Sequence, residues 1–204
     1  APEPQAWSGT EDFGGAEGAA GLHDNWDDPD GYYRVMLGEK LQQRYQIFAI
    51  LGRGIFATVV RARDLQQNGR EVAIKIARRQ ETMYKAGMKE ISILQRLSEA
   101  DPDNKMFIVH FFTHFEHRGH LCMVFESLGL NLREIVKRFG KDVGLNLQAV
   151  KTYTKQMLLA LALLREKQFV HADIKPDNIL VNEAKTIAKL ADFGSASTAS
   201  EMEI

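Results

Sequence analysis

The chain has 204 residues, of which 45% are hydrophobic and 26% are charged, and these are ordinary values for a globular protein. They argue against a fibre, a wholly disordered chain and a bundle of membrane helices, since the longest purely apolar run covers only residues 157–164. At about 150 residues per domain, the length predicts one domain with extra sequence, or one larger domain that has been cut. The single cysteine, Cys122, excludes an intramolecular disulfide and a site of several thiolates.

The first 33 residues differ in composition from the rest of the chain. They contain acidic residues and no lysine or arginine, so the formal net charge of −1 combines an acidic start with a remainder of +7. Because this stretch is also rich in Gly, Ala and Pro and has no apolar period, we expect residues 1–33 to form a disordered acidic leader. Residues 34–204 are then expected to form the globular part.

Two β-rich runs within residues 45–65 are separated by Gly52 and Gly54, and a hairpin turn is predicted at Asn68-Gly69. A glycine-rich loop can hold phosphate because its backbone approaches the ligand closely and offers N–H groups. Since a second strand follows the glycines where a dinucleotide fold or P-loop requires a helix, the pattern favours a loop folded over a nucleotide. Taken alone, the motif is weak evidence, and an ordinary glycine-containing hairpin would be the default interpretation.

The strand predicted over residues 71–77 alternates, and it places Lys75 on the face opposite three β-branched side chains. Residues 79–97 have apolar side chains at helical spacing, and Glu90 falls inside that stripe. An inward carboxylate is costly to desolvate unless it is paired. We therefore predict that Glu90 pairs with Lys75 beside the glycine loop; the alternative for Lys75 is a solvent-facing lysine at a sheet edge.

A dense group of polar residues follows a helix predicted over residues 147–167. It occupies residues 171–178, and Asp192-Phe193-Gly194 comes after a β-rich pair at 179–181 and 187–191. Phosphoryl transfer requires metal-bound oxygens, positive charge on the phosphates and an acceptor hydroxyl oriented by a base. The residues that match these requirements are Asp173, Lys175, Asn178 and Asp192.

Together these segments resemble the eukaryotic protein kinases over about residues 45–194. Within that family, the runs HADIKPDNILVNE and DFGSAS resemble the pre-mRNA-processing-factor-four kinases, which are relatives of the DYRK and CDC-like kinases. The resemblance implies an α+β, kinase-like fold with a β-rich N-lobe, about residues 45–127, that contains one key helix. A partial helical C-lobe is implied over about residues 128–204. The motifs are Gly52-x-Gly54-x-x-Ala57-x-Val59, Val72-Ala73-Ile74-Lys75, Glu90, His171-x-Asp173-x-Lys175-x-x-Asn178 and Asp192-Phe193-Gly194.

The same resemblance implies a serine/threonine kinase that uses ATP and Mg²⁺. Asp173 would be the catalytic base, with Lys175 near the γ-phosphate, while Lys75 would hold the α- and β-phosphates and pair with Glu90. Asn178 and Asp192 would bind magnesium. Phe125 is similar to a gatekeeper residue, and Glu126 and Leu128 to hinge residues. The implied ATP-binding set is Leu51, Gly52, Arg53, Gly54, Ala57, Val59, Ala73, Lys75, Phe125, Glu126, Leu128 and Leu180.

The resemblance further implies protein substrates of the splicing machinery and a nuclear location, with no membrane partner. Three departures from the family pattern are present. Ala57 occupies the place of the third loop glycine, and Ala172 replaces the arginine that often precedes the catalytic aspartate. Only ten residues follow Gly194, so the kinase domain is expected to be incomplete.

Four histidines suggest a zinc site as an alternative function. The strands predicted over residues 107–115 and 121–125 would place two of these histidines on one face of a hairpin and two in its turn. Since zinc needs a fixed tetrahedral ligand set, this is the weaker hypothesis. The histidines are His110, His114, His117 and His120.

Two further alternatives concern the class of protein. The chain could be an ATP-binding or scaffolding module without transfer activity, which the expected truncation favours and the complete set of catalytic side chains disfavours. Nucleic-acid binding by the +7 portion is the third alternative. Its basic residues are dispersed and accompany no nucleic-acid motif, so no direct nucleic-acid partner is expected.

Overall fold

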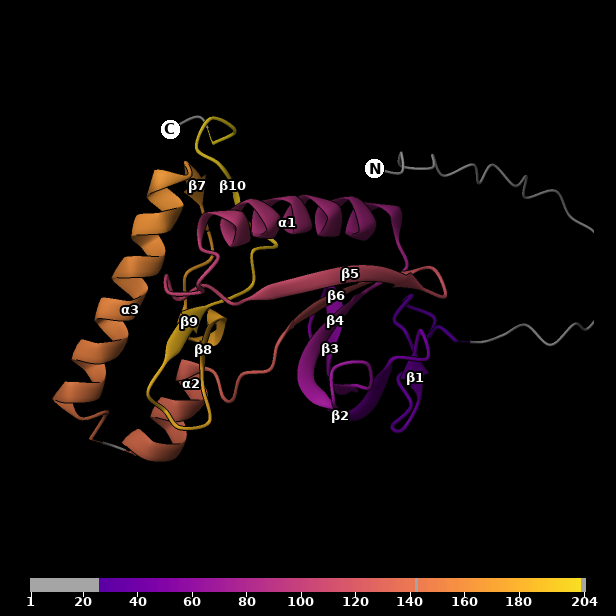
Figure 1. Cartoon of the computed structure of the whole chain (residues 1–204), viewed down its shortest axis with the longest axis horizontal. Helices are drawn as coiled ribbons and strands as arrows, with labels where there is room; N and C mark the ends of the chain where they lie inside the picture. The colour runs from indigo at the N-terminus through magenta and orange to yellow at the C-terminus, as the bar shows by residue number, and fades with distance from the viewer. Residues whose placement is uncertain (1–25, 142, 203–204) are drawn as a thin grey trace, which may run out of the picture.

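The computed structural model describes residues 26–141 and 143–202, in which a β-rich lobe lies beside a helical lobe (Figure 1). The expected α+β architecture, with one prominent helix packed on the β-rich lobe, is confirmed. None of the helices within these residues has the length and apolar character needed to cross a membrane.

The β-rich lobe is built on an antiparallel sheet with the strand order β1-β2-β3-β4-β6-β5. The alternation predicted around Lys75 is confirmed, because Val72, Ile74 and Ile76 are buried on one face of β4 while Lys75 lies on the other. The strands are β1 (Lys40–Leu41), β2 (Tyr45–Arg53), β3 (Ala57–Asp64), β4 (Arg70–Ala77), β5 (Phe111–His117) and β6 (His120–Glu126).

The predicted turn between β3 and β4 is present at Asn68-Gly69. Both residues have positive φ angles, 53° and 73°, which is the conformation that an Asn-Gly pair adopts with little strain. The Gly69 N–H donates to the carbonyl of Asp64 at 2.9 Å, and Asp64 pairs with Arg70 across the strands. The local sequence therefore sets the register of the two strands that flank the glycine-rich loop.

Helix α1 (Glu81–Ala100) lies along the sheet beside β5 and β6 (Figure 1). It buries the stripe predicted from helical spacing, including Glu90, Ile91 and Leu94. The helix approaches β6 closely at Gly87, where an added Cβ atom would lie 2.6 Å from the Cδ2 atom of Leu121. The absence of a side chain at Gly87 thus sets how near α1, and with it Glu90, comes to the sheet.

Replacing Gly87 with valine is expected to destabilise the chain by about 1–3 kcal/mol, because Leu121 is only 2% exposed and has little room to move. Urea unfolding would measure the loss. Ala86→Val is the matched control, because Ala86 is exposed on the same helix and the substitution adds the same β-branched side chain. Equal unfolding midpoints for the two variants would contradict the prediction.

The second lobe contains helices α2 and α3, and each begins at an asparagine cap. Asn131 accepts a hydrogen bond from the Glu134 N–H at 2.9 Å, and Asn146 accepts one from the Ala149 N–H at 2.8 Å. The helix expected over residues 147–167 is confirmed as α3. The elements are α2 (Leu132–Ile135), a π-helical turn η1 (Val136–Gly140), α3 (Leu147–Glu166), a 3₁₀ turn η2 (Pro176–Asn178), and the strand pairs β7 (Phe169–Val170) with β10 (Ser197–Thr198) and β8 (Ile179–Val181) with β9 (Ala188–Leu190).

Two hydrophobic clusters occupy opposite faces of the sheet. One joins α1 and β5–β6 to α3 and β8–β9, and it contains Phe125 and Phe193. The other fills the space enclosed by β1, β2, β3, β4 and β6. Because β8, β9 and the residues after β6 belong to the first cluster, the packing of the two lobes holds the polar residues between them in place.

The leader boundary expected at residue 33 is corrected for residues 26–33. Tyr33 is 4% exposed and belongs to the cluster inside the sheet, and Trp26 packs against the same cluster. Backbone hydrogen bonds join Trp26 to Arg34 and Asp28 to Tyr32. These aromatic side chains show no periodicity in the sequence, so only the tertiary contacts reveal that the segment is ordered. Residues 1–25 of the expected leader lie outside the described part of the chain.

Candidate active site

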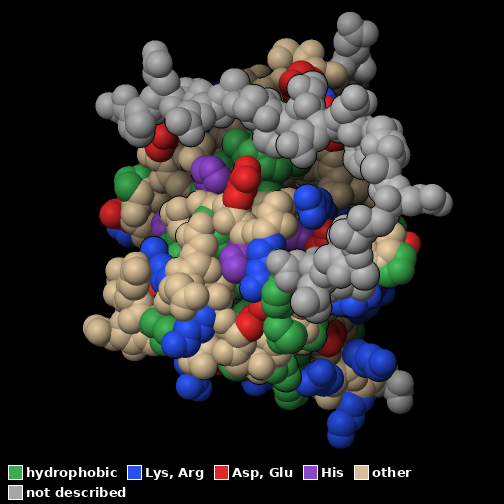
Figure 2. All heavy atoms as spheres, turned by 90° about the vertical axis from the view of Figure 1, so that its right-hand side faces the viewer, with side chains coloured by type: hydrophobic (Ala, Val, Ile, Leu, Met, Phe, Trp, Pro, Cys, Tyr) green, Lys and Arg blue, Asp and Glu red, His purple; other side chains and the backbone are tan. Residues whose placement is uncertain are grey.

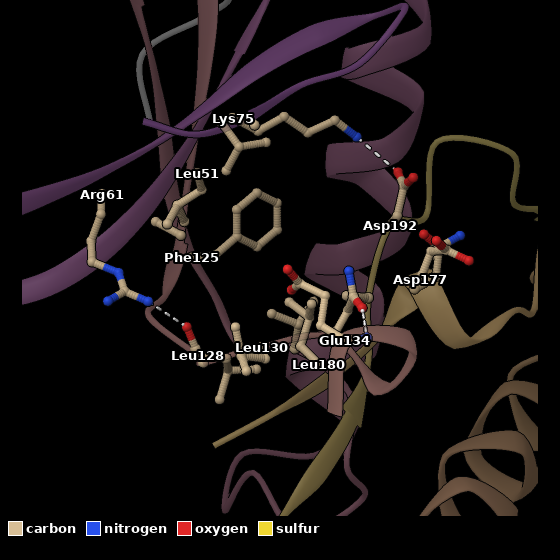
Figure 3. A pocket seen from close by; sticks show the side chains of 18 of the residues that line it. Leu51, Arg61, Lys75, Phe125, Leu128, Leu130, Glu134, Asp177, Leu180 and Asp192 are labelled. Atoms are coloured by element: carbon tan, nitrogen blue, oxygen red, sulfur yellow. Dashed lines mark hydrogen bonds and ion pairs between the residues drawn. The ribbon is translucent and has the colours of Figure 1, made fainter. Parts of the chain in front are cut away.

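A cleft of about 810 Å³ lies between the two lobes. In Figure 3, Lys75 points toward Asp192 at one end of the cleft, Arg61 and Leu128 lie at the other end, and the Phe125 ring lies between them. Eleven of the twelve residues expected around a nucleotide line this cleft, together with Glu90, Asn178 and Asp192. The eleven are Leu51, Gly52, Gly54, Ala57, Val59, Ala73, Lys75, Phe125, Glu126, Leu128 and Leu180.

The exception is Arg53, which is absent from the cleft lining. Its guanidinium forms an ion pair with Asp28 at 2.6 Å and lies over the Tyr32 ring at 3.7 Å from the centroid. The spacing of the glycine motif places Arg53 in the loop, but its partners come from a segment more than twenty residues earlier. The sequence pattern therefore located the residue and missed the direction of its side chain.

The predicted pairing of Lys75 with Glu90 is confirmed. The Lys75 Nζ donates to both carboxylate oxygens of Glu90, at 2.9 and 2.8 Å, and to Oδ1 of Asp192 at 3.0 Å. Burial opposes the charge on Lys75, but the two carboxylates outweigh it and raise its pKa. Burial would likewise raise the pKa of Asp192, but Lys75 outweighs it and lowers that pKa. Lys75 and Asp192 are thus held in their charged forms at neutral pH.

A second polar group forms around Asp173, next to the cleft. Its Oδ2 atom accepts hydrogen bonds from Lys175 Nζ at 2.6 Å and from Asn178 Nδ2 at 3.0 Å. The Asn178 Nδ2 also donates to the Asp173 carbonyl, at 2.9 Å. The Lys175 hydrogen bond is the largest cause of a lowered pKa at Asp173. The carboxylate is therefore ionised at neutral pH and can accept a proton.

His171 connects the Asp173 loop to the strand that leads into Asp192. Its Nε2 lies 3.0 Å from the carbonyl of Ala191, so this nitrogen carries the proton, and its Nδ1 accepts the Asp173 N–H at 3.3 Å. Burial lowers the pKa of His171, which favours this neutral, two-sided arrangement. The backbone is left-handed at Ala172 and at Asp192, with φ values of 63° and 61°. The fold thus holds both aspartates in orientations that a relaxed loop would rarely adopt.

Sequence reasoning missed two basic residues that contact the hinge, Arg61, which lines the cleft, and Lys189, which does not. Arg61 Nη2 donates to the Leu128 carbonyl at 2.8 Å, as Figure 3 shows. Lys189 is buried on β9 and donates to Glu126 Oε1 at 2.6 Å and to Asn104 at 2.9 Å. A lysine inside an apolar strand was a usable signal, but its partners lie too far away in the sequence to be identified.

The four histidines do not gather into one site. His110 and His114 contact phenylalanine rings of β5, whereas His117 lies 3.4 Å from the Tyr33 hydroxyl. His120 is fully buried between the Ala77 carbonyl and Asp27. Across residues 26–141 and 143–202, no three His, Cys, Asp or Glu side chains form a group that could hold a metal.

The comparisons with known proteins agree with this geometry. The protein kinase domain family matches residues 45–203, which is most of the chain. The chain belongs to the protein kinase family.

The kinase domain is similar to "Serine/threonine-protein kinase prp4" of Schizosaccharomyces pombe, with 55% identity over 185 residues, or 91% of this chain and 39% of the relative. It is 47% identical to "Serine/threonine-protein kinase prpf4B" of Dictyostelium discoideum, over 90% of this chain and 23% of the relative. It is 39% identical to "DYRK-family kinase pom1" of Schizosaccharomyces pombe over 172 residues, which cover 84% of this chain and 16% of the relative. The chain spans well under half the length of these curated relatives. The expected resemblance to this group of kinases is confirmed.

The residues of this kinase domain fit a nucleotide and a divalent cation. A Cβ atom at Gly52 would have no atom within 4 Å, and one at Gly54 would approach only the Ala57 carbonyl, at 3.8 Å, so a phosphate chain can approach the loop backbone. Carboxylate and amide oxygens, such as those of Asp192 and Asn178, are ligands that Mg²⁺ prefers, and phosphates and water complete its shell. Asp192, Asn178 and the glycine loop would therefore hold Mg-ATP.

Proposed function

We propose that this kinase domain belongs to an ATP-dependent serine/threonine protein kinase. The observation that carries the proposal is that two charged groups lie at one cleft: Lys75 with Glu90 and Asp192 lines it, and Asp173 with Lys175 lies next to it, joined to its lining through Asn178. The relatives named as serine/threonine-protein kinases support the same activity. A scaffolding module would not require this set of charges.

Each side chain has a defined task in phosphoryl transfer. Lys75, charged and held by Glu90, binds phosphate oxygens, and Asp192 with Asn178 supplies oxygen ligands for Mg²⁺. The bound ion neutralises charge on the phosphates. Asp173 orients the acceptor hydroxyl and accepts its proton, and the Lys175 ammonium lies close enough to Asp173 to face the transferred group.

We propose proteins of the pre-mRNA splicing machinery as the substrates and the nucleus as the location. The resemblance of residues 171–183 to the pre-mRNA-processing-factor-four kinases supports this substrate class, as do the names prp4 and prpf4B.

Phe125 gives a direct test of the substrate class. Its side chain lines the cleft and is 9% exposed, so Phe125→Ala should open space for an ATP analogue that carries a bulky group on the adenine amine. In a nuclear extract, the full-length variant is expected to transfer thiophosphate from this analogue to splicing proteins, identified by mass spectrometry. The parent enzyme should not use the analogue, because Phe125 blocks it.

The control combines Phe125→Ala with Asp173→Asn, which keeps the enlarged cleft and removes the proposed base. Labelling that depends on Asp173 but falls on proteins unrelated to splicing would contradict the substrate class and leave the kinase activity intact. Labelling that persists in the double variant would contradict the proposed chemistry.

A further inference from the structure

The segment Trp26–Arg34, called the strap below, contacts the glycine-rich loop from outside the cleft. Tyr32 makes the central contact, because the single proton of its hydroxyl is shared between the carbonyls of Gly54 and Ile55, whose oxygens lie 2.9 and 2.8 Å away. In the part of the chain that the structure describes, no strap residue lines the cleft. The strap therefore holds the loop backbone and leaves the nucleotide side free.

The Tyr32 ring is itself in contact with two arginines. The Arg53 guanidinium lies 3.7 Å from the ring centroid and the Arg78 guanidinium lies 4.6 Å from it. Arg53 belongs to the glycine loop, and Arg78 follows β4. The ring thus joins the loop to the segment that leads into α1.

Two further side chains, Asp28 and Arg78, hold the same loop. Asp28 Oδ2 binds Arg53 Nη2 at 2.6 Å, while its Oδ1 accepts the backbone N–H groups of Asp30 and Tyr32. Arg78 Nη1 donates to the Ile55 carbonyl at 3.2 Å, and its other nitrogens donate to the Asp30 carbonyl. The loop is thereby held at the Arg53 side chain and at the successive carbonyl groups of Gly54 and Ile55.

The strap is firmly attached to the rest of the lobe. The Arg79 N–H donates to the Gly31 carbonyl at 2.8 Å, and Gly31 has a φ of +78°, which favours glycine there. Asp27 binds the buried His120 at 2.7 Å, and Tyr33 donates to Glu39 at 2.7 Å. Figure 2, which faces the β1 side, shows acidic, basic and histidine side chains interspersed on this surface.

Two backbone hydrogen bonds also hold the loop tip, from the Gly54 N–H to the Ala57 carbonyl at 2.9 Å and from the Arg78 N–H to the Phe56 carbonyl at 3.1 Å, but its side chains are exposed. Ile55 and Phe56 are 73% and 60% exposed, so the tip makes few contacts with the core. A loop supported only by its strand ends samples many conformations, and ordering it on ligand binding costs free energy. A clamp that orders the loop beforehand removes part of this cost.

We propose that the strap is a clamp that pre-organises the glycine-rich loop for nucleotide phosphates, with Tyr32 as its positioning residue. The proposal rests on the proposed function, since it assigns the loop to Mg-ATP. Tyr32 does not touch the reacting atoms; it acts through the carbonyl groups of Gly54 and Ile55. The clamp therefore affects nucleotide affinity more than the chemical step.

The test uses Tyr32→Phe in the full-length protein, with Tyr33→Phe as the matched control. Both substitutions remove one phenol hydroxyl from the strap, but Tyr33 binds Glu39 and not the loop. Tyr32→Phe is expected to weaken Mg-ATP binding by about two- to tenfold, the effect of one lost hydrogen bond on an equilibrium. It should also speed amide hydrogen exchange in residues 52–57 of the nucleotide-free protein. Tyr33→Phe should change neither the Mg-ATP affinity nor the amide exchange of the loop, although both variants should lower thermal stability.

Equal Mg-ATP affinity and equal exchange in the two variants would overturn the clamp. If the parent protein binds no Mg-ATP, the proposed function fails, while the exchange experiment still decides whether the strap orders the loop. Asp28→Asn is a second variant, because an asparagine Oδ1 can keep both backbone hydrogen bonds while the charge that pairs with Arg53 is lost. Asp28→Asn should also speed amide hydrogen exchange in residues 52–57. Unchanged exchange in this variant would contradict the clamp.

Discussion

Replacing Asp173 with asparagine is expected to lower kcat for protein phosphorylation by about 10²–10⁴-fold, the usual contribution of a positioned general base. Affinity for Mg-ATP should remain close to that of the parent, because Asp173 does not line the cleft and its neighbours Asn178 and Asp192 stay in place. Steady-state kinetics together with calorimetric ATP titration on the full-length enzyme would measure both quantities.

The protonation state of Asp173 sets the sign of the pH dependence. Lys175 lowers the pKa of Asp173, so the deprotonated base form persists to pH values below the range in which an ordinary carboxyl group titrates. The base is lost only when the pH falls through this lowered pKa. Loss of activity between pH 8 and about 5 would therefore have to come from another group.

Asp103→Asn is a suitable control for Asp173→Asn, since Asp103 is an exposed carboxylate that pairs with Lys105 away from the cleft. The control should keep the kcat of the parent. If the Asp173 variant transferred phosphate as fast as the control, the kinase mechanism would be wrong. Absence of transfer by both the parent and the Asp103 control would instead favour the scaffolding alternative.

Replacing Lys75 with methionine is expected to lower activity by about 10²–10³-fold and to destabilise the domain by about 3–5 kcal/mol. The second effect follows from Glu90, whose side chain is 4% exposed and would be left as a buried, unpaired charge. Asp192 would lose the same partner at 3.0 Å, but it is half-exposed and can be solvated. Denaturant unfolding and kinase assays would measure the two losses separately.

A second substitution separates stability from catalysis. In Lys75→Met/Glu90→Leu, the buried charge is replaced by an apolar side chain, so most of the lost stability should return. Activity should stay low, because no ammonium group remains to bind phosphate. Recovery of activity in the double variant would show that Lys75 has a structural task only. A single variant that unfolds at the same urea concentration as the parent would contradict the buried-charge argument.

The sequence supported correct predictions wherever a short-range pattern carried the physical cause. Alternation within β4 placed Lys75 opposite the apolar face, and helical spacing placed Glu90 inward, so their pairing followed from the cost of burying a lone carboxylate. The Asn68-Gly69 turn followed from two residues that tolerate positive φ. In each case the relevant neighbours lie within about twenty residues.

Contacts between distant segments could not be predicted in this way. Lys189 was visible as a polar residue in an apolar strand, but its partners Glu126 and Asn104 lie more than sixty residues earlier. Arg53 was assigned to the nucleotide, whereas the fold turns its side chain toward Asp28. Such pairings depend on which segments the tertiary fold brings together.

The sequence alone therefore indicated the order of the elements through local periodicity, and it indicated the family and the residues that carry the proposed chemistry through the resemblance of its motifs to those of protein kinases. Only the tertiary structure decided that Trp26–Arg34 form an ordered strap and that Tyr32 reaches the loop carbonyls. The physical reason is that an acidic, aperiodic segment has no local signal of order. Its burial comes from core and loop groups that other parts of the chain provide.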